Sequence, residues 1–243
     1  MRLTDRIALV TGGAHRVGRA IALSLAERGC HLIIHYHASG QAAAETVAEI
    51  QVMRRRAAAV QADLSTSEGV AKLFRLVDEV FGGLDLLVNS AAVLLPKDLL
   101  EVGDEDWRQT VGLNLKGAFF CLQQAALRMR ARGGGAIVNI SDLAGLRPWK
   151  RFPLHSISKA GVEMLTQVAA LALAPNIRVN AIAPGAVLKP AGMDDSRWQK
   201  ITSALPLRRP GTPQDVARAV VFLFENDYVT GETLVVDGGG QWA

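Results

Sequence analysis

Short apolar segments alternate with longer amphipathic segments along almost the whole chain, and this alternation constrains the fold more than any other feature. Each apolar segment has the length of a strand, and the segments between them carry apolar residues at helical spacing. The predicted strands are 7–10, 31–35, 57–60, 84–88, 136–140, 177–182 and 233–236. The predicted helices run from the turn at 12–13 to about 28 and then over about 41–54, 67–81, 105–130, 153–173 and 212–225. This order predicts a parallel sheet with helices on both faces.

The predicted sheet belongs to one α/β domain, residues 1–243. Continuous apolar strands such as IALV, LLVN and AIVNI are typical of strands buried on both faces. No Pro/Gly/Ser linker divides the chain, and no repeat of fixed period is visible. The composition, with 49% hydrophobic and 21% charged residues, excludes a disordered chain, a collagen-like fibre and a coiled coil. We therefore expect a doubly wound domain that binds its ligands at the carboxyl ends of the strands.

Charge and cysteine content exclude several other classes. The 27 Lys and Arg against 23 Asp and Glu leave a net charge of only +4, in scattered groups, so we expect no nucleic-acid partner. Cys30 and Cys121 lie far apart with no metal-ligand spacing, so we expect reduced thiols and no metal. No run of about 18 apolar residues occurs, and no signal-like segment is visible, so we expect no membrane partner and a cytoplasmic location.

A glycine-containing turn follows the first predicted strand, with the sequence TGGAHRVG over residues 11–18. Glycines there let backbone N–H groups approach a pyrophosphate, and the helix that follows adds a favourable dipole. The alternative is an ordinary strand–helix turn. The position after the first strand of a βαβ unit favours a dinucleotide site, with Gly12, His15, Arg16, Val17 and Gly18 as the candidate residues.

The second strand ends in residues that favour NADP(H) over NAD(H). A site for NAD usually places an acid there to bind the ribose 2′-hydroxyl, whereas this chain has His37, Ala38 and Ser39. A carboxylate would repel a 2′-phosphate, and its absence permits one. His15 and Arg16 supply positive charge or donors to that phosphate. The alternative for His37 is a surface histidine without a ligand.

An acid, a histidine and a lysine come together in the second half of the predicted sheet. His155 and Lys159 are four residues apart on one helix face, and Asp142 follows the fifth strand. Spacing alone favours no role, because a His and a Lys are often four apart without any shared function. Near the carboxyl ends of strands, however, the three side chains are candidates for acid–base chemistry.

The chain resembles the short-chain dehydrogenase/reductase family over nearly its whole length. It has seven sequence features in the order in which the family has them. They are the loop 11–18, Asp63-Leu64, Asn89-Ser90-Ala91-Ala92, Asn114, Lys159, Pro184-Gly185 and the ending Val236-Asp237-Gly238-Gly239. The resemblance implies a single Rossmann-type doubly wound sheet of about seven parallel strands. It also implies cofactor contacts from the following residues beyond those already named: Asp63, Leu64, Asn89, Ser90, Ala91, Lys159, Pro184, Gly185 and Val187.

Within that family the chain most resembles the pteridine reductases. They share arginine in the glycine loop, here Arg16, a His-Tyr-His segment, here 35–37, and aspartate in place of the usual catalytic serine, here Asp142. Two positions differ: His155 stands where the family has its catalytic tyrosine, and Leu94 where pteridine reductases have an aromatic residue that stacks on the pterin. The resemblance implies Asn114, Asp142, His155 and Lys159 as the catalytic set.

The identity of the proton donor stays open at this level. The charge of Lys159 favours the neutral imidazole of His155, and an ionised Asp142 favours the imidazolium. Imidazolium is a proton donor near neutral pH, and a protonated Asp142 is another candidate.

Three functions agree with these residues. The first is an NADPH-dependent reductase of a pterin, dihydrofolate-like or small carbonyl substrate; the second is an NADP(H)-binding protein without turnover; the third is other chemistry on the same fold. We expect residues 187–205 to form a lid over the substrate, and Arg147, Lys150 and Arg151 to favour an anionic substrate. The alternative for these three is a basic surface loop. The resemblance also implies a homotetramer, with the two longest helices at one interface and the C-terminal strand at another.

Overall fold

Seven parallel strands form one sheet in the computed structural model, which describes residues 1–190 and 192–242. The strands are β1 (Ile7–Thr11), β2 (His31–Tyr36), β3 (Ala57–Gln61), β4 (Leu86–Asn89), β5 (Gly135–Ile140), β6 (Ile177–Pro184) and β7 (Thr233–Val236). Their order is β3-β2-β1-β4-β5-β6-β7. The expected α/β fold is confirmed, with every predicted strand present.

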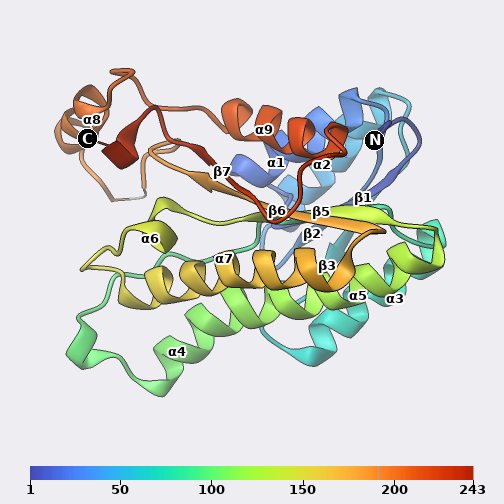
Figure 1. The fold of residues 1–243 in the computed structure, drawn as a ribbon, viewed down its shortest axis with the longest axis horizontal. Helices are drawn as coiled ribbons and strands as arrows, with labels where there is room; N and C mark the ends of the chain where they lie inside the picture. The colour runs from blue at the N-terminus through green and yellow to red at the C-terminus, as the bar shows by residue number, and fades with distance from the viewer. Residues whose placement is uncertain (191, 243) are drawn as a thin grey trace.

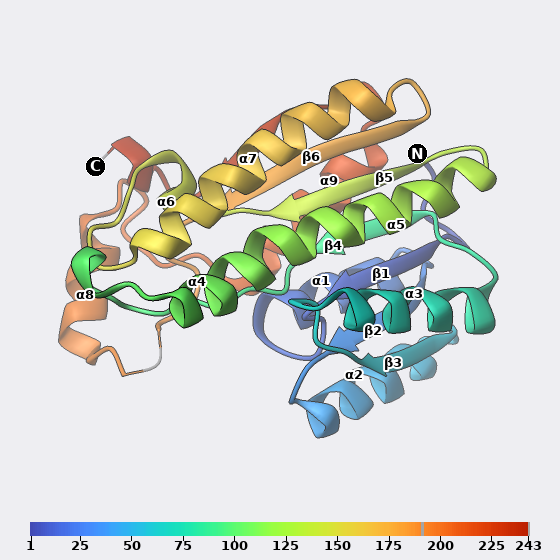
Figure 2. The ribbon, with the colours of Figure 1, turned by 90° about the horizontal axis from the view of Figure 1, so that it is seen from below.

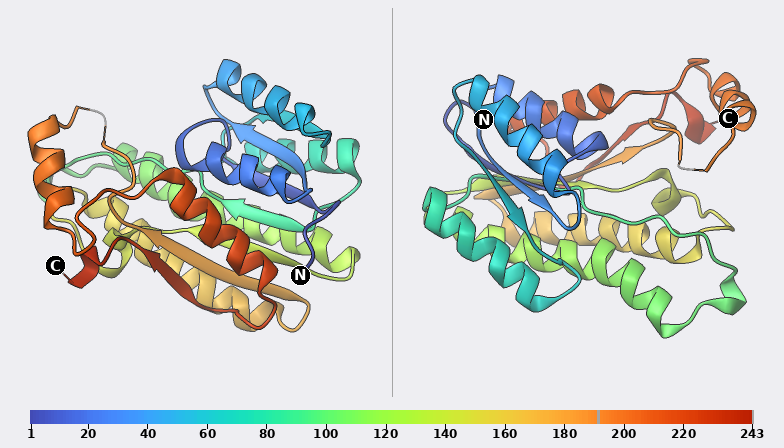
Figure 3. Two further views of the ribbon diagram at one scale, coloured as in Figure 1. Left: turned by 90° about the horizontal axis from the view of Figure 1, so that it is seen from above. Right: turned by 180° about the vertical axis from the view of Figure 1, so that it is seen from behind.

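Helices cover both faces of this sheet. On one face lie α1 (Arg16–Glu27), α2 (Gly40–Val52) and α9 (Pro213–Glu225) (Figure 1; Figure 3, left). The opposite face carries α3 (Ser67–Phe81), α4 (Asp104–Val111), α5 (Ala118–Ala131) and α7 (Pro153–Leu173) (Figure 2). Two apolar clusters fill the spaces, one under each helical layer. Within the part of the chain that the structure describes, no helix is both long and apolar enough to span a membrane.

The predicted helix 105–130 differs most from the structure. It is α4 and α5 joined by one turn of π-helix, η2 (Gly112–Gly117), which has only six residues and therefore shows no period of its own in the sequence. Sequence analysis also missed the shorter helices, which have too few residues for a periodic pattern. They are η1 (Leu99–Glu101), α6 (Leu143–Leu146), α8 (Asp195–Ala204) and η3 (Gly240–Trp242).

The strand order places the candidate site. β1 pairs with β2 on one side and with β4 on the other, so the winding of the chain reverses direction at β1. In such sheets the loops on the two sides separate above the carboxyl ends of the strands and leave a crevice there. The predicted lid contains α8, at the same end of the molecule as α6 (Figure 1); its residue 191 lies outside the described residues.

Candidate active site

A cavity of about 380 Å³ opens at the carboxyl ends of β1 to β4. Most of the residues predicted to bind the cofactor line it: Gly12, His15, Arg16, Val17, Gly18, His37, Ala38, Ser39, Asp63, Leu64, Ser90 and Ala91. The sequence prediction did not include the other lining residues, Ala14, His35, Tyr36, Ala62, Ala92, Val93 and Leu113. These are neighbours of predicted residues in the same loops, apart from Leu113 in the π-helical turn.

The backbone of the glycine loop folds back on itself so closely that Gly18 has no room for a side chain. Gly12 has φ of +64°, a backbone conformation that favours glycine. A Cβ atom on Gly18 would lie 2.2 Å from the carbonyl oxygen of Gly12. The hydroxyl of Thr11 accepts hydrogen bonds from the backbone N–H groups of Ser90, at 2.9 Å, and Ala91, at 3.1 Å. The end of β1 is therefore fixed to the end of β4, with the start of α1 exposed to the cavity.

His35, which is buried, contacts the glycine loop from β2. The sequence prediction did not assign it to the site. The N–H of Gly12 donates to Nδ1 of His35 at 3.1 Å, and Nε2 of His35 lies 3.1 Å from the carbonyl oxygen of Ala62. Nδ1 is thus the acceptor and Nε2 carries the hydrogen. Burial lowers the pKa of His35 from 6.5 to about 4, so the ring is neutral at physiological pH. The sequence held one signal, a polar residue inside an otherwise apolar strand.

The end of β2 has the chemistry of an anion site. His37 is exposed there, and Ser39 precedes α2 without using its hydroxyl to cap the helix. Among the described residues that line the cavity, Asp63 is the only acid. Its carboxylate accepts from the backbone N–H and the hydroxyl of Ser65, and these hydrogen bonds lower the pKa of Asp63. This part of the cavity therefore presents hydrogen-bond donors and imidazoles to an anion. The carboxylate of its one acid, Asp63, is already hydrogen-bonded within its own turn.

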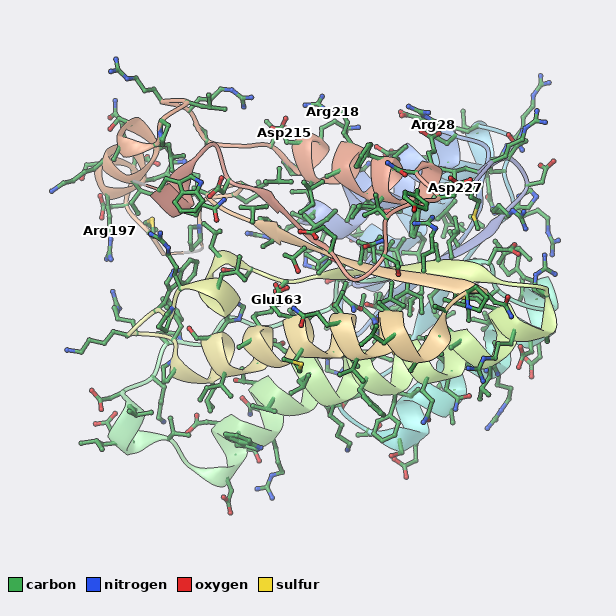
Figure 4. The ribbon with its side chains drawn as sticks, in the orientation of Figure 1. Arg28, Glu163, Arg197, Asp215, Arg218 and Asp227 are labelled. Atoms are coloured by element: carbon green, nitrogen blue, oxygen red, sulfur yellow. The ribbon has the colours of Figure 1, made fainter. Side chains whose placement is uncertain are left out.

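The four residues predicted to be catalytic come together beyond this cavity. Asn114, His155 and Lys159 are buried, and the side chain of Asp142 is partly exposed. Lys159 donates to the carbonyl oxygen of Ile140, at the end of β5, at 2.6 Å. Burial lowers the pKa of Lys159 to about 8, while the charges of Asp142 and Glu163 act in the opposite direction. Glu163 lies between α7 and the sheet and accepts a hydrogen bond from the hydroxyl of Thr233 (Figure 4).

The π-helical turn presents Asn114 to this cluster. The amide oxygen of Asn114 accepts from the N–H of Val93 at 2.8 Å, and Nδ2 donates to the carbonyl oxygen of Val93 at 3.0 Å. Nδ2 also donates to the hydroxyl of Ser158 at 3.1 Å. Asn114 therefore holds both polar groups of Val93, which lines the cavity on its other side.

His155 occupies the centre of the cluster. Its Nδ1 lies 3.2 Å from the carbonyl oxygen of Val93, and its Nε2 lies 3.6 Å from Oδ2 of Asp142. The indole of Trp149 lies nearly parallel to the imidazole, with ring centroids 6.4 Å apart. The other carboxylate oxygen of Asp142 accepts from the N–H of Ala144 and caps α6 at 2.8 Å.

Four other predicted residues lie outside the 380 Å³ cavity. Asn89 is buried and bridges the carbonyl oxygen of Ala118 and the amide of Asn139. Pro184 ends β6, and the N–H of Gly185 donates to the carbonyl oxygen of Val236. Val187 lines a second cavity, of about 440 Å³, together with residues of β7 and the segment before α9. Among the described residues, no group of three or more His, Cys, Asp and Glu side chains is arranged to hold a metal ion.

Comparison with known proteins decides the family. A family model described as enoyl-(acyl carrier protein) reductase matches residues 12–241. A short-chain type dehydrogenase/reductase of Picea abies is 37% identical, over 98% of this chain and 93% of the relative. The chain belongs to the short-chain dehydrogenase/reductase family. A second relative, the L-rhamnose 1-dehydrogenase (NAD(P)(+)) of Azotobacter vinelandii, is 38% identical over 98% of both chains.

Solved structures agree with this assignment. The crystal structure of a putative short-chain alcohol dehydrogenase from Sinorhizobium meliloti 1021 is similar with a TM-score of 0.94 and 36% identity. The match covers 99% of this chain and 98% of that one. The relatives of this short-chain dehydrogenase/reductase are oxidoreductases, and the family binds a nicotinamide cofactor. The cavity fits such a cofactor, because the glycine loop leaves its N–H groups and the start of α1 open to a phosphate.

Proposed function

We propose that this short-chain dehydrogenase/reductase is an NADPH-dependent reductase. The observation that carries the NADP(H) preference is the composition of the cavity at the end of β2. His15, Arg16 and His37 line it, and no carboxylate from β2 faces the place where an NAD site holds its ribose-binding acid. Arg16 is exposed at the first position of α1 and forms no ion pair among the described residues, so its guanidinium is free for a 2′-phosphate.

Residues of the chain itself supply a cation, a proton and the positioning of these groups. The reduced nicotinamide, when bound, supplies a hydride. Lys159, held against the end of β5, provides a cation beside the reacting atoms. Asp142 and His155 provide the proton, and Asn114 keeps the Val93 peptide in place against the imidazole.

We propose a pterin, a dihydrofolate-like compound or a small carbonyl compound as substrate. The three features shared with pteridine reductases, at Arg16, 35–37 and Asp142, support a pterin. Leu94, where those enzymes have a stacking aromatic residue, supports a smaller carbonyl instead. The relative from Azotobacter vinelandii is named for a sugar, which adds polyols and sugars to the compounds worth testing.

The second candidate function is NADP(H) binding without turnover. It is favoured by His155, which stands where the family has its catalytic tyrosine. An imidazole is shorter than a phenol, and Nε2 of His155 is buried rather than exposed to a substrate. A protein of this kind would act as a sensor of the NADPH pool or as a structural partner.

The decisive experiment measures cofactor binding and turnover separately. Dissociation constants for NADPH and NADH come from fluorescence titration, and NADPH consumption is followed with pterins, dihydrofolate, quinones, sugars and small carbonyl compounds. We expect NADPH to bind more tightly than NADH, and at least one substrate to be reduced. Equal or tighter binding of NADH contradicts the NADP(H) preference, and binding without turnover on any compound favours the second function.

A pair of arginine variants tests the proposed 2′-phosphate site. Arg16→Ala should weaken NADPH about tenfold or more and change NADH little, because only NADPH carries the phosphate. Arg19→Ala is the matched control: it lies one turn along α1, pairs with Glu49 and does not line the cavity. A similar loss of NADH affinity in Arg16→Ala would mean that Arg16 acts on the loop and not on the phosphate.

We further propose that the protein is a homotetramer. The outer faces of α5 and α7 expose apolar side chains, among them Leu127, Met164, Val168 and Leu171. β7 is an edge strand, bonded only to β6 within the described residues. An exposed apolar helix face and an open edge strand are two surfaces that further copies of the chain would cover.

A further inference from the structure

We infer that Asp142 and His155 hold one proton between them, and that Asp142 passes it to the substrate oxygen while His155 acts as a positioning residue. The inference rests on the proposed reductase function for its catalytic consequence. The shared proton itself is a property of the protein without cofactor.

The hydrogen bonds of Asn114 decide which nitrogen of the imidazole carries the hydrogen. Nδ2 of Asn114 has two hydrogens, and both are used, on the carbonyl oxygen of Val93 and on the hydroxyl of Ser158. Asn114 therefore has no hydrogen left for Nδ1 of His155, from which it lies 3.5 Å. The carbonyl oxygen of Val93 is closer, at 3.2 Å, and accepts only. Nδ1 of His155 is thus an N–H donor to Val93.

The opposite side of the ring faces Asp142. With the hydrogen on Nδ1, Nε2 of a neutral imidazole carries only a lone pair. Nε2 is buried without a hydrogen-bond partner among the described residues, and the nearest polar atom recorded for it is Oδ2 of Asp142 at 3.6 Å. A lone pair facing an ionised carboxylate in a buried site is unfavourable. One proton between the two atoms removes the conflict, whether it is drawn on the acid or on the imidazole.

Asp142 is the more exposed member of the pair. The side chain of Asp142 is 23% exposed, and that of His155 is 5% exposed. Oδ1 of Asp142 is held by the N–H of Ala144, which leaves Oδ2 as the oxygen between the imidazole and the open side. The charge of Asp142 acts on Lys159, which lies on α7, the helix that also carries His155. A substrate oxygen therefore reaches Asp142 before it reaches the imidazole.

The resulting step balances in protons and electrons. The carbonyl carbon of the substrate gains the hydride, with its two electrons, from the reduced nicotinamide. The electron pair released onto the substrate oxygen takes the shared proton from Oδ2 of Asp142, forming an O–H bond to the product. Asp142 is left as a carboxylate beside neutral His155, and a proton from water restores the pair.

The first test uses the protein without cofactor and measures the ring nitrogens directly. The ¹⁵N chemical shifts of His155, assigned by comparison with His155→Gln, report which nitrogens carry hydrogen. We expect Nδ1 to be protonated in the wild type, and the shift of Nε2 to change in Asp142→Asn. Asparagine also caps helices well, so this variant should keep α6. Nδ1 without hydrogen, or an Nε2 shift indifferent to Asp142→Asn, overturns the inference even if no substrate is known.

The second test separates donor from positioning residue once a reduced substrate is in hand. Asp142→Asn should lower kcat at least about 100-fold, the usual scale of a lost general acid, while the Kd for NADPH stays within about twofold. His155→Gln should lower kcat less, about tenfold, with little change in KM, because the positioning residue does not itself give up the proton. A loss in His155→Gln equal to that in Asp142→Asn would make His155 the donor and overturn the inference.

Absence of turnover in the wild type would count against the proposed function. The ¹⁵N shifts of His155 test the shared proton independently of turnover.

Discussion

At the scale of the residue, His35 links the fold to pH. Its ring is 2% exposed, and its pKa falls from 6.5 to about 4 because the buried site favours the neutral form. Between these two values the unfolded chain binds a proton that the folded chain does not. The contribution of His35 to stability is therefore complete above about pH 6.5 and is lost as the pH falls toward 4.

We expect the free energy of unfolding to fall by about 3 kcal/mol, through His35 alone, as the pH is lowered from 6.5 to 4. The measurement is urea unfolding at several pH values in the wild type and in His35→Gln. Carboxylates take up protons in the same range in both proteins, so the difference between the two curves isolates His35. Parallel curves would show that the imidazole titrates normally and that Gly12 does not depend on it.

His35 also shows what a sequence can and cannot supply at this scale. The sequence predicted exposed residues such as Arg16 and His37 from their type and position, and both line the cavity. It did not identify the role of His35, because that role comes from two partners, Gly12 and Ala62, that lie 23 and 27 residues away along the chain. The pairing of Asp142 with His155 has the same origin, since it depends on the tautomer that Val93 imposes.

At the scale of the element, the turn between β1 and α1 allows a sharp test. Gly18→Ala should reduce NADPH affinity about tenfold or more, because its Cβ would lie 2.2 Å from the carbonyl oxygen of Gly12 and push the loop into the cavity. Gly112→Ala is the control: its φ is helical, and the nearest atom to its Cβ is the Ser65 side chain at 3.7 Å. Titration of both variants with NADPH, with melting curves beside it, separates a local change from unfolding. Equal affinities would mean that the loop adjusts.

The segment 145–151 allows a second test at this scale. Arg147 lies over the ring of Trp242 at 5.8 Å, and Lys150 and Arg151 are exposed beside it. Arg147→Glu with Lys150→Glu should raise the KM for an anionic substrate about 5- to 10-fold by charge repulsion. Lys72→Glu with Arg75→Glu changes the net charge equally on α3 and should have no effect. An unchanged KM in the first variant would identify 145–151 as an ordinary basic surface loop.

Prediction from sequence worked best for long regular elements. The bounds of α3 and α7 agree with the structure, because both have strong apolar periodicity and clear ends. It failed for α6 and α8, which are short, and for η2, whose six residues are too few to show a period of their own. Of these, α6 and η2 are also the elements that bring Asp142 and Asn114 to the site.

At the scale of the whole molecule, the exposed apolar faces predict assembly. Light scattering behind a sizing column should give four times the 26.0 kDa of one chain. Leu127→Lys with Val168→Lys should reduce this mass, because two charges would enter the helix interface. Val52→Lys, on the opposite face and 85% exposed, is the control and should leave the mass unchanged. A monomeric wild type would contradict the proposal.

The π-helical turn gives the long helix a break in phase. Each residue of an α-helix turns the chain by about 100°, so the extra residue in η2 rotates all of α5 relative to α4. Deleting one residue there would restore a regular helix and would withdraw Asn114 from Val93. The same deletion would also turn Phe119 and Leu127 to another side of the molecule. The rotational phase of α5 thus couples the geometry of the site to the surface by which copies of the chain would meet.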